Sequence, residues 1–559
     1  MVTVRFLPEH QSVTVTPGTT LLEAARQAGV LLESPCNGIG TCGKCRVLLA
    51  GESLRHISLR GADPVSLPTK DEHVALLSCQ AEVHGDLSVE IPVDKQRDLL
   101  QVLSHGQAVA VEQAPCIRKL YVEEQQVTNV FAGDLLLATE AGDTRSCHVG
   151  LVVDIGTTTL VAALVDLASG REIATASALN PQSRQAQDVL SRIHFAAQEN
   201  GLQSLHADLT GEINRLAAEL AQQAGLDSRR IYEVVYSGNT CMLHLATGTS
   251  PAALGRYPYT PVIRGGNHVA AAGQGLAIAA SGLIYLPPVI SGYVGADLTA
   301  GILATGIHRR RGITLLVDIG TNGEMILARD GELRATSTAA GPAFEGMNIS
   351  CGMRACRGAV ESFAVAADGS MHLGTIGNAT ATGICGSGLL DVVSELVAHG
   401  VISGNGRFAA TDNAAQLPAA LKEKLVLREG KPAFAVTDDI FLSQKDVRQV
   451  QLAKGAIRAG IEFLLQDSGI TAEQVDQVLI AGAFGYHLRE QSLLKLGLLP
   501  RAFAGKIKFV GNTSKAGGCA LLLNQDLRDE MAALVTAIEV IELANFPDFD
   551  RVFVKCLGF

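Results

Sequence analysis

Four cysteines near the start of the chain have the spacing of ligands to a single metal centre. Three follow a C-x5-C-x2-C pattern, and the fourth comes later, within Leu76–Gln80. Four thiolates that converge from one loop and one later strand suit a [2Fe-2S] cluster. The loop glycines Gly38, Gly40 and Gly43 allow a tight turn that aims backbone N–H groups at the cluster sulfurs. We therefore predict a [2Fe-2S] cluster with the ligands Cys36, Cys42, Cys45 and Cys79.

Zinc and disulfides are the alternatives for these cysteines. A structural zinc site usually pairs two C-x2-C units, whereas Cys42 and Cys45 form a single one. The chain has 12 scattered cysteines in 559 residues and opens directly into a strand, without the pattern of a secretory leader. Because thiols normally stay free in a reducing compartment, disulfides fit less well than metal ligation. We expect a cytoplasmic protein.

The segments around the cysteine loop resemble the ferredoxin β-grasp fold. Val2–Phe6 and Ser12–Val15 alternate apolar and polar residues like the strands of a hairpin. Thr20–Gly29 has the pattern of a capped amphipathic helix that ends at glycine, and Leu87–Ile91 is a candidate last strand. The x5 spacing differs from that of plant-type ferredoxins and is similar to that of vertebrate and bacterial ones, which leaves the reduction potential open.

Composition restricts the class of partner. With 47% hydrophobic and 18% charged residues over 559 positions, the chain is globular and long enough for three or four domains. The net charge is −11 and no basic run occurs, so we expect no nucleic-acid partner. One long apolar tract, residues 269–296, is interrupted by glycines and by Pro287-Pro288. We expect buried strand and turn there, and no membrane partner.

A second feature is a repeated loop motif. The sequence D-I-G-T occurs at residues 154–157 and again at 318–321, each time after an apolar strand. An internal repeat at this separation implies two related lobes that present these loops to one cleft. In such a loop the glycine exposes N–H groups, the hydroxyls add donors, and the aspartate faces a metal-bound phosphate through water.

Other segments add to this pattern. Residues 295–306 and 510–520 carry small side chains at helical spacing, which suits close helix contact at a hinge. Residues 383–391 lead a glycine turn into a helix, whose N-terminus can bind phosphate. Residues 477–485 form an apolar strand that ends in a glycine loop.

In this order the segments resemble the acetate/sugar kinase, Hsp70 and actin superfamily, with phosphate loops at 154–159 and 318–323, connecting helices at 295–306 and 511–520, and an adenosine loop at 482–485. Fused to a ferredoxin domain, they resemble the reductive activators of corrinoid-dependent methyltransferases over almost the whole chain. Further matching stretches are Asn180–Gln182, Asp188–Ile193, Ser237–Thr240, Ala340–Met347 and Cys351–Met353.

The resemblance implies a multidomain α/β fold. We expect a β-grasp [2Fe-2S] ferredoxin domain over residues 1–95 and a small linker module over 96–147. A two-lobed actin/Hsp70-like ATPase with duplicated ribonuclease-H-like lobes would follow over 148–559, its second lobe beginning near residue 310.

The resemblance also implies ATP and Mg²⁺ in the cleft between the lobes, with Asp154 and Asp318 holding hydrated Mg²⁺. The phosphates would be cradled by Gly156, Thr157, Thr158, Gly320, Thr321, Asn322 and Gly323. The nucleotide would be bordered by Gly386, Ser387, Gly388, Gly482, Ala483, Phe484 and Gly485. Glu324 and Glu345 are candidates for positioning the attacking water, although a glutamate near such a loop is as often a structural cap.

The activity implied is the ATP-dependent return of one electron to an inactive Co(II) corrinoid protein, which regenerates Co(I) for methyl transfer. Transferring one electron to an acceptor whose reduction potential is about 100–200 mV lower costs on the order of 2–5 kcal/mol. The free energy of nucleotide binding could supply this amount. The implied partners are the corrinoid protein, an upstream flavoprotein or ferredoxin, and a second copy in a homodimer. No Asp-x-His-x-x-Gly motif surrounds any of the 14 histidines, so the corrinoid belongs to the partner.

Three other functions are compatible with parts of the pattern. A small-molecule kinase with a redox-sensing ferredoxin domain would share the ATPase scaffold, since fold does not determine function. Activators of 2-hydroxyacyl-CoA dehydratases are also ATP-driven electron donors, but they hold a [4Fe-4S] cluster between subunits and have no ferredoxin domain. A plain electron carrier with a degenerate nucleotide lobe is opposed by the two intact D-I-G-T loops.

Overall fold

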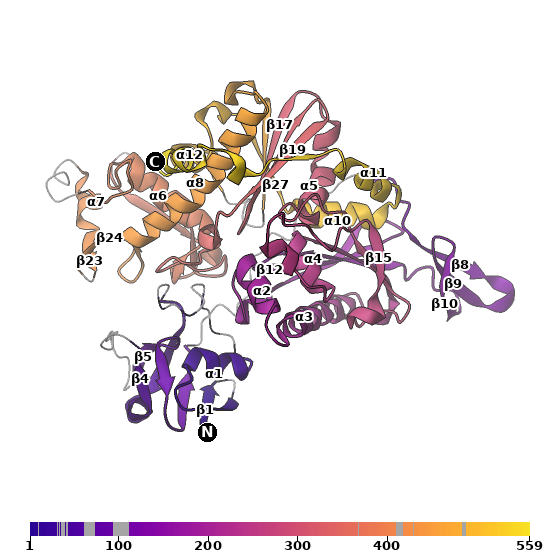
Figure 1. Cartoon of the computed structure of the whole chain (residues 1–559), viewed down its shortest axis with the longest axis horizontal. Coiled ribbons are helices and arrows are strands. Elements are labelled where there is room, and N and C mark those ends of the chain that lie inside the picture. The colour runs from indigo at the N-terminus through magenta and orange to yellow at the C-terminus, as the bar shows by residue number, and fades with distance from the viewer. Residues whose placement is uncertain are drawn as a thin grey trace.

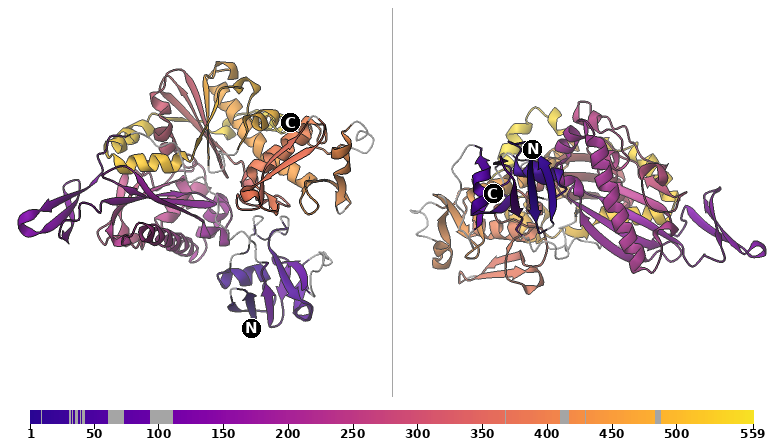
Figure 2. Two further views of the ribbon diagram at one scale, coloured as in Figure 1. Left: turned by 180° about the vertical axis from the view of Figure 1, so that it is seen from behind. Right: turned by 90° about the horizontal axis from the view of Figure 1, so that it is seen from below.

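The computed structural model describes residues 1–8, 10–30, 32, 34, 38, 40, 43–60, 73–92, 111–366, 368–409, 417–428, 430–482 and 488–559. Figure 1 shows an N-terminal domain in indigo, a narrow projecting sheet over residues 117–141, and a body of two lobes. The two further views in Figure 2 place the N-terminal domain and the projecting sheet at different ends of the molecule.

The N-terminal domain is a five-stranded sheet with one helix. Its elements are β1 (Val2–Leu7), β2 (Gln11–Val15), α1 (Leu21–Gln27), β3 (Arg46–Ala50), β4 (Ile57–Leu59), β5 (His73–Leu77), β6 (Ala81–Val83) and β7 (Leu87–Glu90). The main sheet has the order β2-β1-β7-β3-β5, and β4 pairs with β6. β1 pairs antiparallel with β2 and parallel with β7. Alternate residues of β1 share one core with Leu21 and Leu22 of α1. The predicted β-grasp arrangement is confirmed.

The projecting sheet is a three-stranded meander, which we call the β8–β10 meander. It consists of β8 (Ile117–Val122), β9 (Val127–Ala132) and β10 (Leu135–Ala141), with β9 in the middle. Ile117 and Val130 on its inner face belong to the same core as Val152 and Leu521 of the body. One side of the meander is therefore packed against the lobes.

The first lobe is built on a six-stranded sheet. Its strands are β11 (Val149–Ile155), β12 (Thr159–Asp166), β13 (Glu172–Leu179), β14 (Ile231–Gly238), β15 (Asn267–Ala270) and β16 (Leu283–Leu286), in the order β13-β12-β11-β14-β16-β15. The core joins this sheet to α2 (Val189–Ala196), α3 (Gly201–Gln223) and α4 (Thr240–Ala246). The apolar tract of residues 269–296 contains β16, as predicted, and within the described residues no helix is long and apolar enough to cross a membrane.

The second lobe repeats this plan. Its strands are β17 (Ile313–Ile319), β18 (Gly323–Arg329), β19 (Glu332–Thr338), β26 (Gln477–Ala481), β27 (Ile507–Gly511) and β28 (Glu539–Val540), in the order β27-β26-β17-β18-β19-β28. β17 pairs antiparallel with β18 and parallel with β26, just as β11 pairs with β12 and β14. The predicted duplication is therefore confirmed by topology.

Helices and two small sheets complete the second lobe. The helices are α6 (Gly386–Ala398), α7 (Ala419–Glu423), α8 (Gln444–Asp467), α9 (Glu490–Lys495) and α12 (Phe549–Cys556). The helix α11 (Asp526–Val535) instead packs on the first lobe, where Leu527 and Met531 share a core with Val152 and Val235. The first small sheet contains β20 (Ala359–Val365), β21 (Met371–Thr375) and β22 (Gly383–Ile384), and the second contains β23 (Leu425–Arg428), β24 (Lys431–Ala435) and β25 (Phe441–Ser443).

Two helices connect the lobes, α5 (Ala296–Thr305) and α10 (Thr513–Leu523). They cross closely because small residues face each other. A Cβ atom on Gly517 would lie 2.0 Å from the carbonyl oxygen of Ala300, and one on Gly301 would lie 3.2 Å from Thr513 Oγ1. The predicted close helix contact is confirmed, and its role as a hinge stays a prediction.

Candidate functional site

The two D-I-G-T loops meet in the structure. Thr158 and Thr321, one from each loop, lie 3.3 Å apart at their Oγ1 atoms. Glu345 accepts a hydrogen bond from each hydroxyl: Thr321 Oγ1 donates to Glu345 Oε1 at 2.6 Å, and Thr158 Oγ1 donates to Glu345 Oε2. The two lobes therefore present their loops to one place, as the repeat predicts. Glu345 bridges both loops, so it is positioned where a nucleotide phosphate would have to compete for the same hydroxyls.

Four acidic side chains lie beside these loops, of which Glu324 is buried and Asp154, Asp297 and Asp318 are half-buried. Burial raises the pKa of Asp154, and it raises the pKa of Asp318 to about 7 with a further contribution from Asp297 and Asp154. The pKa of Asp297 is likewise raised to about 7 by burial, and that of Glu324 is raised well above its usual value by burial, Asp297 and Asp318. Because these carboxyl groups repel one another, the cluster favours a bound cation. Carboxylate oxygens are also the ligands that Mg²⁺ prefers.

Asp154 is held by the second connecting helix. Asn512 Nδ2 donates to its Oδ2 at 2.8 Å, and Ser514 Oγ donates to its Oδ1 at 2.7 Å. Lys515 comes next in α10, and its Nζ lies 2.6 Å from Glu172 Oε2 of β13. A movement of α10 therefore shifts a carboxylate of the first loop.

A buried polar network holds the first D-I-G-T loop in place. Arg192, fully buried in α2, donates to the carbonyl oxygen of Thr157 at 2.5 Å, and burial lowers the pKa of its guanidinium to about 10. Asn180 Nδ2 donates to the carbonyl oxygen of Gly156 at 2.9 Å. Asn239 Nδ2 donates to Thr157 Oγ1 at 3.1 Å while its Oδ1 caps α4. Three of the matching stretches noted in the sequence thus act by fixing the phosphate loop.

The residues predicted to border the nucleotide lie in two segments, residues 386–388 and residues 482–485. Gly482 lies beside the second loop, because a Cβ there would be 2.4 Å from the carbonyl oxygen of Ile319 and 3.3 Å from Asp318 Oδ1. Ala483, Phe484 and Gly485 lie outside the described residues.

Gly386, Ser387 and Gly388 start α6 and are buried. A Cβ on Gly386 would clash with the carbonyl oxygen of Phe344 at 1.7 Å, and one on Gly388 with that of Val360 at 2.1 Å. Close packing of the helix start already requires these glycines, so their contact with nucleotide stays a prediction.

The two D-I-G-T loops are closed by equivalent backbone hydrogen bonds. In the first loop Gly156 N donates to the carbonyl oxygen of Thr159 at 3.0 Å, and in the second Gly320 N donates to the carbonyl oxygen of Asn322 at 3.0 Å. A hydrogen bond from Asn322 favours the charged form of Glu324, opposing the rise of its pKa that burial and Asp297 cause. Gly323 begins β18, where a Cβ would lie 2.7 Å from Thr338 Oγ1. Both loops therefore keep the tight backbone that exposed phosphate-binding amides need.

The cysteine loop is described in part. Cys36 and Cys42 lie outside the described residues, whereas Cys45 and Cys79 are buried and adjacent. A hydrogen bond with Cys79 lowers the pKa of the Cys45 thiol to about 6, against the opposing effect of burial. The loop glycines Gly38, Gly40 and Gly43 have φ angles of 88°, 84° and 68°. A thiol poised for deprotonation and a left-handed loop that L side chains rarely adopt fit a thiolate-bound cluster.

The cysteine loop also contacts the second lobe. Lys44 Nζ donates to the carbonyl oxygen of Gly352 at 2.5 Å, across 308 positions of sequence. Gly352 belongs to the Cys351–Met353 stretch, whose carbonyls and amides pair with Ile384 ahead of α6. The two functional parts of the chain are thus in direct contact.

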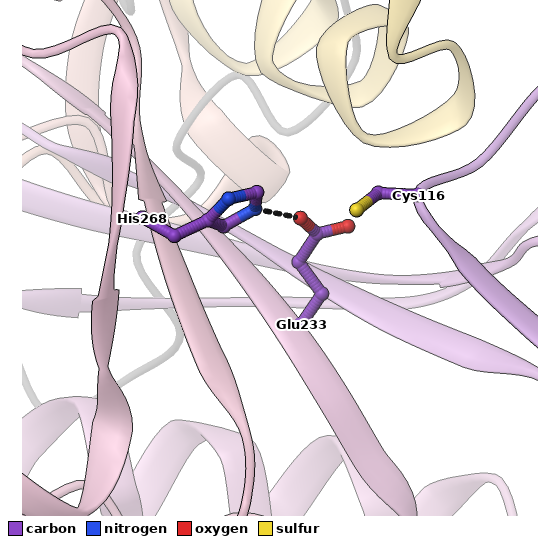
Figure 3. A group of neighbouring side chains, drawn as sticks. All are labelled: Cys116, Glu233 and His268. Carbon is purple, nitrogen blue, oxygen red and sulfur yellow. Dashed lines mark hydrogen bonds and ion pairs between the residues drawn. The ribbon is translucent and has the colours of Figure 1, made fainter. Parts of the chain in front are cut away.

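A third group of chemically capable side chains lies apart from both sites. Cys116, Glu233 and His268 bring a thiol, a carboxylate and an imidazole nitrogen within 4.8 Å of one another (Figure 3). Arg528 Nη1 donates to Glu233 Oε1 at 2.8 Å, lies 3.1 Å from His268 Nε2, and stacks on Tyr285. Because this guanidinium already neutralises the carboxylate and covers the imidazole nitrogen, we interpret the group as an ion-pair network that joins the first lobe to α11.

Sequence reasoning missed Asp297 and Arg192 as site residues. Both lie in segments that the sequence had marked for other reasons, Asp297 in a connecting helix and Arg192 in a matching stretch. The available signal was a charged residue within an otherwise small or apolar helix, since such residues are rarely buried without a partner.

Models of known protein families match three successive parts of the chain. The model of a 2Fe-2S iron-sulfur cluster binding domain matches residues 4–84. The model named RACo middle region matches residues 149–310, and that named C-terminal domain of RACo, the ASKHA domain, matches residues 312–559.

Individual relatives extend this similarity over most of the chain. The chain is 33% identical to the corrinoid activation enzyme RamQ of Eubacterium limosum over 72% of its length and 69% of the relative's. It is 29% identical to a [Co(II) methylated amine-specific corrinoid protein] reductase of Methanosarcina barkeri, over 49% of the chain and 51% of that protein. The solved structure titled reductive activator for corrinoid, iron-sulfur protein matches with a TM-score of 0.75 and 29% identity, covering 100% of this chain and 98% of the other.

Proposed function

Because this chain belongs to the RACo family of activators, we propose that it couples ATP to the one-electron reduction of a Co(II) corrinoid protein. The products would be the Co(I) corrinoid protein, the oxidised electron-transfer domain, ADP and phosphate. The observation that carries the proposal is the contact of Lys44 Nζ with the carbonyl oxygen of Gly352, which joins the cysteine loop to the nucleotide-binding body at 2.5 Å.

In this proposal the nucleotide binds where the two loops converge. Thr158 and Thr321 would exchange their hydrogen bonds with Glu345 for bonds to phosphate oxygens. Asp154, Asp297, Asp318 and Glu324 would hold Mg²⁺, which neutralises phosphate charge when it is bound. Glu345, released from the two hydroxyls, would be free to orient water. ATP binding would thereby draw the lobes together through α10, which carries the donors to Asp154.

The electron-transfer part is proposed to work through the cysteines. Cys36, Cys42, Cys45 and Cys79 would hold the [2Fe-2S] cluster, which when bound supplies a one-electron carrier. The chain's own contribution is to exclude water from the two described sulfurs, since Cys45 and Cys79 are 1% and 5% exposed. Lys44 would then transmit movement of the second lobe to this loop, because it contacts the segment ahead of α6.

We further propose the partners of this reaction. A flavoprotein or ferredoxin would reduce the chain, the corrinoid protein would receive the electron, and a second copy of the chain would complete a homodimer. The ten cysteines of the described residues form no disulfide, which agrees with work in a reducing cytoplasm.

The deciding experiment is anaerobic. Dithionite-reduced protein is mixed with a Co(II) corrinoid methyltransferase subunit, and Co(I) absorbance is followed with and without Mg-ATP. We expect Co(I) only with Mg-ATP, and we expect Asp318→Ala to abolish the ATP dependence while the visible iron–sulfur spectrum stays intact. Asp438→Ala is the control, because the Asp438 side chain is fully exposed and far from the loops in sequence.

Two outcomes would contradict the proposal. If cobalt stayed Co(II) with several corrinoid partners while ATP was still consumed, a small-molecule kinase would be the better description. If Asp318→Ala removed the iron–sulfur spectrum as well, the nucleotide and cluster sites would not be the separate modules described above.

A further inference from the structure

One segment of the second lobe, residues 345–353, contacts both candidate sites. At its start, Glu345 accepts a hydrogen bond from Thr321 Oγ1 at 2.6 Å and another from Thr158 Oγ1. Near its end, the carbonyl oxygen of Gly352 accepts a hydrogen bond from Lys44 Nζ at 2.5 Å. Lys44 directly precedes Cys45, one of the predicted cluster ligands. A single short segment therefore joins the two phosphate loops to the cysteine loop.

The 345–353 segment is closed on itself by backbone contacts. A Cβ atom on Gly346 would lie 2.2 Å from the carbonyl oxygen of Met353, and one on Gly352 would lie 2.1 Å from the carbonyl oxygen of Gly346. Gly346 also has a φ of 76°, which L side chains rarely adopt. Because backbone packs directly on backbone, no side chain can adjust to absorb a movement. A displacement of Glu345 therefore reaches Gly352.

The same segment is anchored to the second lobe at one further residue. Ser350 N donates to Asp446 Oδ1 at 2.7 Å, and the buried side chain of Asp446 belongs to the capping box at the start of α8. A short closed segment that is held at Ser350 can turn about this residue but cannot stretch. Its two ends therefore move together.

These contacts connect nucleotide binding with the attachment of the cysteine loop. A phosphate that takes the hydroxyls of Thr158 and Thr321 displaces Glu345. A hydrogen bond is lost once donor and acceptor separate beyond about 3.5 Å, so a shift of about 1 Å at Gly352 is enough to release Lys44. We propose that Lys44 is a positioning residue: its bond to Gly352 favours the position of Glu345 that occupies the two hydroxyls, and nucleotide binding breaks this bond. The inference rests on the proposed function and names how the nucleotide site is regulated.

The coupling acts in both directions. Attachment of the cysteine loop weakens nucleotide binding by the same factor by which nucleotide weakens the attachment, because the two equilibria are linked. During the proposed cycle, nucleotide binding thus frees the cysteine loop from the second lobe at the moment when the electron has to pass to the corrinoid protein.

A binding titration of the full-length, cluster-loaded protein tests the first direction, with N-methylanthraniloyl-ATP and Mg²⁺ as the probe. Lys44→Met keeps the apolar stem but removes the donor to Gly352, so it should bind the probe at least about fivefold more tightly than the wild type. Lys44→Arg restores a donor and should return the affinity to the wild-type value. The visible iron–sulfur spectrum of each variant checks that the cluster is loaded.

Arg46→Met is the matched control. Arg46 is an exposed cation two residues further along the chain, and its Nε donates to the carbonyl oxygen of Gly43 within the cysteine loop itself. This variant should bind the probe as the wild type does. If it bound as tightly as Lys44→Met, positive charge near the loop would be responsible, and the proposed hydrogen-bond coupling would be wrong.

Lysine acetylation of the wild type tests the second direction without any substitution. The rate at which the Lys44 amine is acetylated is followed by mass spectrometry, with and without a non-hydrolysable ATP analogue. Release from Gly352 should raise this rate at least about fivefold. Lys431 is the internal control, because it is exposed on β24 and its rate should not change.

Two results would overturn the inference and leave the proposed function intact: equal probe affinity in Lys44→Met and the wild type, or a Lys44 acetylation rate that does not respond to bound nucleotide. Failure of the wild type to bind the probe at all would instead contradict the proposed function. The acetylation measurement also keeps the inference testable if Lys44→Met does not retain its cluster.

Discussion

At the scale of single residues, the proposed nucleotide site is unusual for the number of carboxylates it brings together. Asp297 lies in the first turn of α5, and its Oδ1 accepts a hydrogen bond from Leu298 N at 2.8 Å. Its carboxylate contributes to the raised pKa of Asp318 and Glu324. Such repulsion costs stability in the absence of a cation and is relieved when a cation binds.

We predict that Asp297→Asn stabilises the cation-free protein and weakens the binding of Mg²⁺. Asparagine keeps the shape and the acceptor for Leu298, but it removes one of the mutually repelling charges. The melting temperature in EDTA should rise, while the Mg²⁺ concentration for half-maximal ATPase activity should increase at least about tenfold. Differential scanning fluorimetry and Mg²⁺ titration measure the two effects.

Asp526→Asn is the matched control, because Asp526 also lies in the first turn of a helix but is exposed. An unchanged Mg²⁺ requirement in Asp297→Asn would show that Asp297 serves only the packing of α5.

At the scale of secondary-structure elements, the crossing of α5 and α10 joins the two lobes. Gly517 allows the approach, since its missing side chain leaves room for the carbonyl of Ala300. The same helix carries Asn512, its N-cap, and Ser514, which donate to Asp154. The helix crossing and the first phosphate loop are therefore mechanically linked.

We predict that Gly517→Ala lowers the free energy of unfolding by at least about 2 kcal/mol and weakens ATPase activity. The added methyl group would lie 2.0 Å from a backbone carbonyl oxygen, so the helices must separate. Gly211→Ala in α3 is the control, because a Cβ there meets nothing within 4 Å. At this exposed position of α3 the exchange should raise stability by up to about 1 kcal/mol. Urea unfolding of both variants measures the contrast, and equal effects would contradict the close crossing.

At the scale of the whole molecule, the buried carboxylate of Glu140 links the meander to Arg230 and Tyr232 of the first lobe. Glu140 of β10 lies 2.7 Å from Lys119 Nζ and 2.6 Å from Arg230 Nη1, and it accepts from Tyr232 Oη at 2.8 Å. Burial opposes its charge, but the hydrogen bonds from Lys119, Thr144, Tyr232 and Arg230 prevail and lower the pKa of Glu140 to about 2. The meander is therefore held in a fixed position against the first lobe.

We predict a pH-dependent loss of stability in Glu140→Gln. A carboxyl group whose pKa falls from 4.5 to about 2 on folding stabilises the fold above pH 4.5, and this contribution is lost as pH falls through 2. The variant should be less stable at pH 7 by on the order of 3 kcal/mol. The difference should shrink steadily below pH 4.5, because protonated glutamate resembles glutamine.

Chemical denaturation at several pH values measures this difference. Glu124→Gln is the control, because Glu124 is an exposed glutamate of the same module. A difference that stayed constant down to pH 3 would show that packing, and not charge, attaches the meander.

Much of the architecture was predictable because its signals are local. Thr20 caps α1 by accepting from Glu23 N at 3.2 Å, and Gly29 follows with a φ of 71°, as the helix pattern indicates. The repeated D-I-G-T motif correctly predicted two lobes with the same strand pairing. Alternation, capping and glycine turns depend on neighbours a few residues apart, so they can be read without the fold.

The sequence by itself therefore determined the ferredoxin-like domain, the duplicated lobes and the positions of the loops. Only the tertiary structure decided that Glu345 bridges the hydroxyls of Thr158 and Thr321, and that Asp297 lies with the other acids beside the loops. It also decided which face of the meander stays uncovered. These features depend on residues of different elements, such as Thr158 and Glu345, which are 187 positions apart. Their distance and burial are set by packing between elements and leave no periodic trace in the chain.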